Sequence, residues 1–323
     1  MAFVSYDLIQ TDSQLAALVG TLRSSGCTRL AIDVEGENNL HSYGIHVALI
    51  QLFDGTRGYV VDVLSIRDRA QLRALLEAVP WTLVWFDAAN DLLSFQHALS
   101  IRPSPILDLA VAARLLGKPG GLQALTQQGG SSSAKDRFQK SNWMRRPISR
   151  AMLDYAISDV MHLLPLADSL MAELARRGLG QIFQERNKEQ ECAERTWNPL
   201  ANYTRIPGFN RLSRELRSFA QILWYAREYY GRKRDVPPGM VASKQEMRSM
   251  IDQGVLKPDG IVAFLNRSRR KVPIDAREFS ACFAQAERDV AAALPREGHD
   301  MAAQQRGGRG VTREKDKLAS RGE

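Results

Sequence analysis

Three short apolar segments that follow one another near the N-terminus constrain the fold more than any other feature. They are residues 29–35 (RLAIDVE), 47–53 (VALIQLF) and 58–63 (GYVVDV), and the pair Asp54-Gly55 separates the second from the third. Short segments rich in branched apolar residues and bounded by turn residues are typical of strands, and an Asp-Gly pair favours a hairpin. The sequence therefore predicts three consecutive strands in hairpin order.

Helical and strand patterns alternate after this point. Residues 68–79 have helical spacing and end before Pro80, residues 81–86 (WTLVWF) read as a strand, and a further helix begins near Asn90. Several more helices are expected within 108–180, and Thr11 with Gln14 predicts a capping box at the start of an earlier helix. Strands first, then strands alternating with helices, predict an α/β fold: a mixed sheet flanked by helices.

The second part of the chain differs from the first. An irregular stretch at 194–211 contains two prolines and predicts a domain boundary near 196–208, after which a helical block is expected over about 212–290. The Gly/Ser-rich segment 128–136 predicts a flexible loop, and the polar segment 293–323 predicts a disordered basic tail. A chain of 323 residues is long enough for one large domain and a smaller one.

Charge is distributed unevenly between these parts. Residues 1–195 carry 20 Lys and Arg against 21 Asp and Glu, whereas residues 196–323 carry 24 against 15. A near-neutral body joined to a basic appendage favours a polyanion such as nucleic acid as partner. Basic surface that merely aids solubility is the alternative.

Several other classes of protein are disfavoured. No apolar run approaches the roughly 18–20 residues that cross a bilayer, and the N-terminal residues have no basic segment followed by an apolar one. The three cysteines, Cys27, Cys192 and Cys282, are odd in number and far apart, which fits reduced thiols better than a disulfide framework or a zinc site. We therefore expect a cytoplasmic protein with no membrane partner.

Two carboxylates stand on the first predicted strand. Asp33 and Glu35 are two residues apart, so the alternation of a strand puts both on one face, about 7 Å apart. Two acids that point the same way from an apolar strand are costly unless a cation joins them. A strand end that meets water is the alternative, because such a pair alone is weak evidence for a metal.

Three more residues extend this set. Asp91 opens a helix directly after the strand at 81–86, where an Asp also stabilises a helix dipole. Tyr155 and Asp159 are spaced i,i+4 and share one helical face, with Ala156, Ile157 and Val160 packing the other side. Each position also has a purely structural interpretation when it is taken alone.

In this order and spacing, the five residues resemble the DEDD exonuclease superfamily in its tyrosine-containing branch. The segments 33–55, 107–128 and 139–166 look like ribonuclease D and the related nuclear-exosome exonuclease, and the resemblance spans about residues 8–180. Segment 216–251 is similar, more loosely, to the helical HRDC domain that follows the exonuclease in ribonuclease D. The resemblance implies a ribonuclease H-like exonuclease domain at 1–195, an HRDC-like domain at 209–292 and the tail at 293–323.

The resemblance also implies the chemistry. It assigns Asp33, Glu35, Asp91 and Asp159 as ligands of two divalent ions, Mg²⁺ or Mn²⁺, with Tyr155 positioning the attacking water. Asp33 would bridge both ions, Glu35 and Asp159 would complete the ion that activates water, and Asp91 would act mainly through the second. Hard oxygen ligands suit these ions. Four crowded carboxylates repel one another, so metal-free protein should be less stable.

The expected substrate is RNA with a single-stranded 3′ end, such as a tRNA precursor, processed by a monomer to nucleoside 5′-monophosphates. A DNA exonuclease and a non-catalytic RNA-binding scaffold are the alternatives, and the intact ligand set disfavours the scaffold.

Three departures from the family pattern are Gly36 after the acidic pair, a basic residue shifted to Lys135, and Asp87 near a position where relatives often have histidine. His162 is expected to be outside the chemistry, and Trp143 is expected to be structural. Weaker candidates for nucleic-acid contact are His41, Tyr43, Lys140, Arg145, Arg146, Arg150, Arg227, Arg232, Lys233 and Arg234.

Overall fold

The structure is a computed structural model that describes residues 5–118, 120–126, 138–267 and 273–293. The chain divides into two compact units, one of Met1–Asn202 with Gly231–Val241 and the other of Tyr203–Tyr230 with Ala242–Glu323. The predicted loop at 128–136, Lys135 within it, and the predicted tail beyond residue 293 lie outside the described residues. The domain limits expected from the sequence remain predictions.

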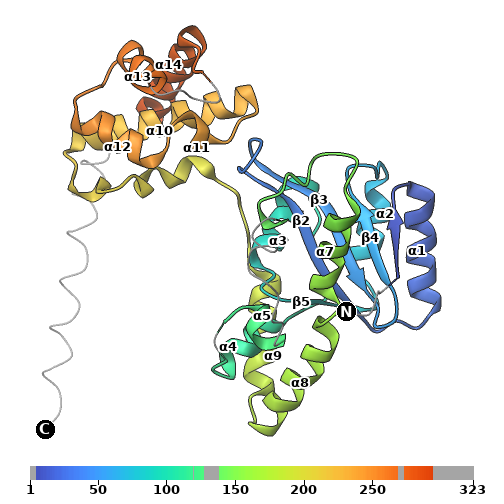
Figure 1. Ribbon diagram of the computed structural model, residues 1–323. Coiled ribbons are helices and arrows are strands. Elements are labelled where there is room, and N and C mark those ends of the chain that lie inside the picture. The colour runs from blue at the N-terminus through green and yellow to red at the C-terminus, as the bar shows by residue number, and fades with distance from the viewer. Residues whose placement is uncertain (1–4, 119, 127–137, 268–272, 294–323) are drawn as a thin grey trace, which may run out of the picture. The chain divides into compact units, whose positions relative to one another are not determined.

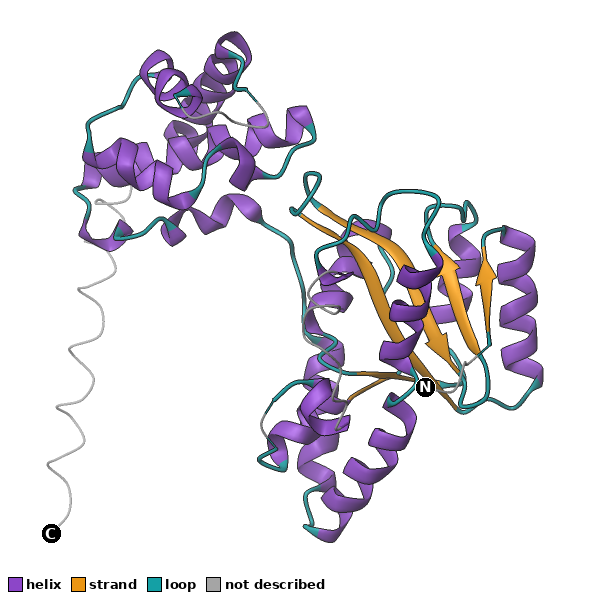
Figure 2. Cartoon of the chain, viewed as in Figure 1, coloured by secondary structure: helices purple, strands orange, loops and turns teal. Residues whose placement is uncertain are grey.

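A six-stranded mixed sheet forms the centre of the first unit (Figure 2). Its order is β1-β4-β3-β2-β5-β6, and β3 runs antiparallel to both of its neighbours while every other neighbouring pair is parallel. The strands are β1 Tyr6–Ile9, β2 Arg29–Asn38, β3 Ile45–Phe53, β4 Gly58–Asp62, β5 Thr82–Trp85 and β6 Ile106–Asp108. The predicted mixed sheet flanked by helices is confirmed.

The turn between β3 and β4 shows why the hairpin order was readable from the sequence. Gly55 adopts a positive φ of 101°, which costs a glycine little. The Asp54 carboxylate accepts the backbone N–H groups of Thr56 at 2.8 Å and Arg57 at 2.7 Å. Asp54-Gly55 therefore closes the hairpin by local hydrogen bonding, as such pairs do in turns.

Helices cover both faces of the sheet (Figure 1). The capping box of Thr11 and Gln14 is present at the first helix, and Asp68 caps the second, which ends at Leu76 rather than at residue 79. After Leu76 the C-cap residue Glu77 is already extended, so the predicted helix was too long by about one turn. The helices of this unit are α1 Asp12–Ser24, α2 Arg69–Leu76, α3 Ala89–Ser94, α4 Leu109–Leu115, α5 Leu122–Thr126, α7 Arg150–Val160, α8 Leu163–Arg176 and α9 Gly180–Cys192, with a π-helical turn at Phe95–Leu99.

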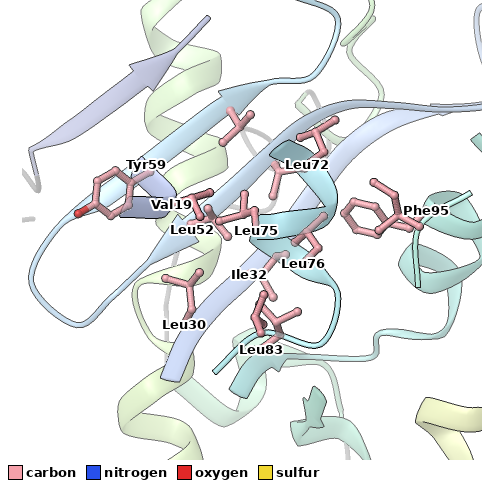
Figure 3. Close-up of a cluster of buried hydrophobic side chains, with 14 of the residues drawn as sticks. Val19, Leu30, Ile32, Leu52, Tyr59, Leu72, Leu75, Leu76, Leu83 and Phe95 are labelled. Carbon is pink, nitrogen blue, oxygen red and sulfur yellow. The ribbon is translucent and has the colours of Figure 1, made fainter. Parts of the chain in front are cut away.

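Alternation along the strands sends buried side chains into two separate cores. On one face, Leu30 and Ile32 of β2 pack with residues of α1 and α2 such as Val19 and Leu72 (Figure 3). On the other face, Ala31 of β2 belongs to a cluster formed largely with α4, α7 and α8. Asp33 and Glu35 follow Ala31 at the period of two that strands impose, so both lie on the α7 side of the sheet.

The remaining described elements are helical, which agrees with the helical block expected after residue 212. Phe279, Leu223 and Tyr230 are fully buried here, and the Tyr230 hydroxyl accepts the backbone N–H of Asp275 at 2.9 Å. No described helix of the chain is long and apolar enough to cross a membrane. The elements are short 3₁₀ helices at Pro199–Arg205 and Phe209–Arg211, then α10 Arg214–Arg234, α11 Pro238–Val241, α12 Lys244–Asp252, α13 Pro258–Asn266 and α14 Ala276–Ala293.

Candidate active site

Strand β2 carries the first two carboxylates in the middle of the sheet. It lies between β3 and β5, with Asp33 opposite Gln51 and Glu35 opposite Leu49. The register shifts between Glu35, which pairs with Leu49, and Gly36, which pairs with Val47, so β3 has a bulge at Ala48, beside the acidic pair. Bulges of this kind occur beside active sites because they redirect side chains.

Helix α7 brings the second pair of residues over the same face. Ser149 caps the helix by accepting the backbone N–H of Met152, and the predicted apolar side, with Ala156 and Val160, is buried against the sheet. Tyr155 and Asp159 point into a cavity of about 260 Å³ shared with the β2 carboxylates. The cavity is lined by Asp33, Glu35, Phe86, Leu122, Gln139, Tyr155, Asp159 and Leu163.

Asp91 lies in the first turn of α3, which follows β5. Burial raises the pKa of its carboxyl well above the ordinary value, and the negative charge of Asp33 raises it further. A like charge raises the pKa of a carboxyl in this way when the two groups are near each other. The structure therefore brings Asp91 close to Asp33, and all five residues that the sequence singled out lie in one region.

Tyr155 is held by its neighbours in a protonated state. Burial raises the pKa of its phenol, and the charges of Asp159 and Glu35 raise it further because a phenolate would be repelled by both. The ring stacks on Phe138 at a centroid distance of 5.2 Å and on Trp143 at 6.2 Å. Tyr155 is therefore a hydrogen-bond donor in a fixed orientation at neutral pH.

The donor set fits hard divalent cations. Four carboxylates on β2, α3 and α7 converge, and the mutual repulsion of Asp33 and Asp91 is what a bound cation would relieve. Among the described residues, no three His, Cys, Asp or Glu side chains already form a group that could hold one ion. The fit to a cation rests on the cavity that Asp33, Glu35 and Asp159 share and on the charge that Asp33 exerts on Asp91.

Three residues near this region were missed by the sequence analysis. Gln139 and Phe86 line the cavity, and Gln51 is fully buried opposite Asp33. Within the described part of the chain, neither side-chain atom of the Gln51 amide has a hydrogen-bond partner. A buried amide in this state is unusual in a core. The signal in the sequence was a glutamine within the run 47–53, whose other residues are all apolar.

The two substrate candidates in the β2–β3 connection are held by contacts within the first unit. His41 lies against the buried carboxylate of Glu37, with Nδ1 3.2 Å from Oε2 and its backbone N–H donating to Oε1 at 2.8 Å. Tyr43 packs edge-on against Trp197 at a centroid distance of 5.7 Å. His162, expected outside the chemistry, is exposed and is not among the residues that line the cavity.

Arg146 has a structural role that the sequence analysis did not foresee. Its guanidinium forms a bidentate ion pair with Asp62, with Nε–Oδ2 at 2.8 Å and Nη2–Oδ1 at 2.5 Å. It also donates to the carbonyl oxygens of Trp143 at 2.7 Å and Ala48 at 3.2 Å. Because these contacts engage all three guanidinium nitrogens, a phosphate grip by Arg146 is no longer the favoured interpretation.

The neighbouring basic residues are more accessible. Lys140 and Arg145 are exposed, and Arg150 pairs with Asp154 at 2.8 Å while its guanidinium lies 4.5 Å from the centre of the Tyr6 ring. Trp143 is 1% exposed, in agreement with its expected packing role.

The candidates on α10 separate into buried and exposed positions. Arg227 is 5% exposed, donates to Glu228 at 2.6 Å and stacks on Trp224 at 3.6 Å. Burial of this guanidinium disfavours the nucleic-acid contact that the sequence suggested for Arg227. The basic residues of the last turn are exposed: Arg232, Lys233 and Arg234.

Gly36 permits the close approach of β2 to β3 at the bulge beside the acidic pair. A Cβ at this position would lie 2.0 Å from the backbone carbonyl oxygen of His46. Only a shift of the β2 or β3 backbone could relieve this overlap. Gly36→Ala is therefore expected to lower the free energy of unfolding by about 2 kcal/mol and to displace Glu35. Urea denaturation and the nuclease assay described below measure the two effects.

Gly20→Ala is the matched control for this substitution. Gly20 lies in α1, and an added Cβ would meet nothing within 4 Å. Alanine should stabilise that helix by up to about 1 kcal/mol and leave hydrolysis unchanged. Equal stability and activity in Gly36→Ala and the wild type would contradict the role assigned to the bulge.

Comparison with known proteins agrees with this geometry. A family model described as 3′-5′ exonuclease matches residues 6–175. Ribonuclease D of Cronobacter turicensis is 29% identical over 204 residues, covering 60% of this chain and 54% of that protein. Ribonuclease D of Escherichia coli is 26% identical over 256 residues, covering 76% and 66%. The chain thus spans between about half and two thirds of the length of these relatives.

Solved structures share the fold. Escherichia coli RNase D, described as an exoribonuclease involved in structured RNA processing, superposes with a TM-score of 0.68 at 24% identity, covering 90% of this chain and 76% of that one. The catalytic core of RRP6 from Trypanosoma brucei gives a TM-score of 0.70 at 22% identity, covering 91% and 82%. At these identities the likeness concerns the fold alone. The matched region covers more than half of the 323 residues and contains the gathered acids and Tyr155, and the chain belongs to the 3′-5′ exonuclease family.

Proposed function

We propose that this protein is a 3′→5′ exoribonuclease that hydrolyses RNA from its 3′ end and releases nucleoside 5′-monophosphates. One observation carries the proposal: Asp33, Glu35, Tyr155 and Asp159 line a single cavity, and Asp91 is close enough to Asp33 for the charge to raise its pKa. Relatives named Ribonuclease D support RNA as the substrate class.

The reaction transfers a phosphoryl group to water. A water oxygen attacks the last phosphodiester, the bond from phosphorus to the 3′ oxygen breaks, and the shortened RNA keeps that oxygen as a 3′ hydroxyl. Two divalent ions, Mg²⁺ or Mn²⁺, supply Lewis acidity for the attacking water and the leaving oxygen in reactions of this kind. The side chains that line the cavity would position the scissile phosphate and the attacking water.

Each acidic residue has a proposed role. Asp33, central on β2, would contact both ions, Glu35 and Asp159 would hold the ion on the side of the attacking water, and Asp91 would hold the other. Tyr155 stays protonated because its pKa is raised, so it would orient water by donating a hydrogen bond and would not act as a general base.

RNA is preferred over DNA in this proposal, with single-stranded 3′ ends of structured RNAs such as tRNA precursors as the natural class. Metal-assisted hydrolysis does not by itself distinguish the sugars, so a DNA exonuclease is the second candidate. The exposed basic residues Arg232, Lys233 and Arg234 in the last turn of α10 would attract either polyanion. Action as a monomer in the cytoplasm is part of the proposal.

The test compares a 5′-labelled single-stranded RNA with the matching DNA, each with Mg²⁺, with Mn²⁺ or with EDTA. A ladder of shortening 5′-labelled products from RNA, absent in EDTA, is expected, and a uniformly labelled RNA should yield nucleoside 5′-monophosphates. Faster shortening of DNA would select the second candidate. Intact RNA and DNA under both metals, with the protein folded by circular dichroism, would favour a non-catalytic scaffold.

A further inference from the structure

Asp108 is a buried carboxylate outside the set of proposed ligands, and it accepts three backbone N–H groups. It ends β6, is 0% exposed and caps α4 by accepting the backbone N–H of Ala110 at 2.9 Å through Oδ1. The same oxygen accepts the backbone N–H of Asp87 at 2.9 Å, and Oδ2 accepts that of Ala88 at 3.1 Å. Gln190 completes the set, donating to Oδ2 at 3.2 Å.

Two of these donors belong to the turn that leads into α3, the helix carrying Asp91. Asp87 has a positive φ of 63°, a conformation that non-glycine residues adopt only when their surroundings hold them there. The Asp108 carboxylate bonds to the N–H of that residue and of the next one. It therefore fixes the direction in which the chain leaves β5 and enters α3.

Helix α3 depends on this support because its own start is weak. It has six residues, and its N-cap residue is Ala88, whose methyl side chain cannot accept a capping hydrogen bond. N-terminal N–H groups that no cap satisfies need another acceptor. Asp108 supplies an acceptor for the N-cap N–H of Ala88 and for the N–H of Asp87 before it, so it holds the chain where it enters the helix that carries Asp91.

Helix α9 holds Asp108 in place from the other side. Asn187 accepts the backbone N–H of Asp108 at 2.8 Å and donates to the carbonyl oxygen of Ile106 at 2.8 Å. Glu191 accepts the backbone N–H of Ile106 at 3.0 Å. Side chains of α9, which lies beyond the region matched by the family model, thus occupy the open hydrogen-bonding edge of β6.

We propose that Asp108 is a positioning residue for Asp91: it locks the turn at Asp87–Ala88 and, supported by α9, sets where the Asp91 carboxylate stands relative to Asp33. The inference rests on the proposed function, since Asp91 is taken there as a metal ligand. Asp108 itself touches neither substrate nor metal in this scheme.

The test replaces Asp108 with Asn and measures Mn²⁺ binding to the full-length protein. Asparagine keeps the shape, but one of its two head atoms is an NH₂ group that cannot accept, so one orientation loses the hydrogen bonds from Asp87 and Ala110 and the other loses that from Ala88. Residues that orient a metal ligand typically contribute 10- to 100-fold to metal affinity. We expect the Kd for Mn²⁺, followed by the electron paramagnetic resonance signal of the free ion, to rise by about tenfold or more.

Asp54→Asn is the matched control. Asp54 also accepts two backbone N–H groups in a tight turn, from Thr56 and Arg57, but that turn joins β3 to β4 and supports no proposed ligand. Both variants should lose stability, whereas only Asp108→Asn should weaken Mn²⁺ binding. Gln190→Ala, which keeps the carboxylate and removes one donor, should raise the Kd about threefold and provides the test if Asp108→Asn does not fold.

The outcomes distinguish this inference from the proposed function. Wild-type affinity for Mn²⁺ in both Asp108→Asn and Gln190→Ala would overturn the positioning role, and so would an equal loss in Asp54→Asn. Wild-type protein that neither binds Mn²⁺ nor shortens RNA would instead overturn the proposed function, and this inference with it. Weakened Mn²⁺ binding with RNA hydrolysis that recovers at high Mn²⁺ is the expected result.

Discussion

Asp33→Asn is expected to lower the rate of RNA hydrolysis by about 10³-fold or more, roughly 4 kcal/mol of transition-state stabilisation. Asp33 stands on the central strand of the sheet, lines the cavity and acts on the pKa of Asp91. An amide keeps the shape but removes the charge that would hold two cations. Single-turnover hydrolysis of 5′-labelled RNA at saturating Mn²⁺ measures the loss.

Stability in EDTA separates this loss from misfolding. The charge of Asp33 raises the pKa of Asp91, so removing it relieves repulsion within the metal-free protein. The variant should therefore unfold at or above the wild-type midpoint when metal is absent, and it should gain less stability than the wild type when Mn²⁺ is added. Full hydrolytic activity in Asp33→Asn would refute its assignment as a ligand.

Asp168→Asn is the control for the same chemical change elsewhere. Asp168 lies on α8, where its side chain is 64% exposed and pairs with Arg29 at 2.5 Å. It lines no part of the site cavity. Hydrolysis should match that of the wild type, and stability should change by less than about 1 kcal/mol, as is usual for exposed ion pairs.

Arg146→Ala is expected to lower the free energy of unfolding by about 3 kcal/mol, the largest stability effect that we predict. Asp62 ends β4 with its side chain 0% exposed, and Arg146, just before α7, is its bidentate partner. Removing the guanidinium leaves a buried carboxylate without its cation. Urea denaturation measures the loss, and Arg146→Ala combined with Asp62→Asn should cost less than the sum of the two single changes.

The pH dependence gives an independent check. Burial alone would raise the pKa of Asp62, but the hydrogen bonds and charge of Arg146 more than offset it, so the pKa is lowered. The ion pair therefore contributes stability that is present above the unfolded pKa of about 3.9 and is lost as pH falls through the lower folded value. The difference in unfolding free energy between wild type and Arg146→Ala should narrow as pH falls below about 4.

Arg150→Ala provides the comparison with an arginine four residues away. Arg150 forms an exposed ion pair with Asp154 on α7, with side chains 63% and 41% exposed, and its removal should cost less than about 1 kcal/mol. An Arg146→Ala variant as stable as Arg150→Ala would show that the buried pair contributes little.

Local patterns were sufficient for most of the first unit. The hairpin strands, the capping box at Thr11 and the amphipathic α7 follow from residues close together in sequence, and all were predicted. The strands β1 and β6 were missed because they have four and three residues, too few for alternation to be seen. They become strands only because longer neighbours offer hydrogen-bonding edges.

The sequence also singled out the five candidate site residues, because their order and spacing resemble the pattern of the DEDD exonuclease superfamily. The sequence did not reveal which charged side chains would be paired inside the folded protein and so removed from its surface. Arg146 and Arg227 read as surface cations, and each is held by a carboxylate or aromatic partner whose placement depends on packing.

What the sequence by itself determined is therefore the mixed sheet, the helical second part and the set Asp33, Glu35, Asp91, Tyr155 and Asp159. Periodicity and turn chemistry act over a few residues, so they can be read along the chain. Only the tertiary structure decided that Asp33 and Asp91 share one region, that Gly36 must lack a side chain, and that Asp108 supports the turn before α3. These relations join residues far apart in sequence, and only the folded sheet brings them within hydrogen-bonding or charge–charge distance.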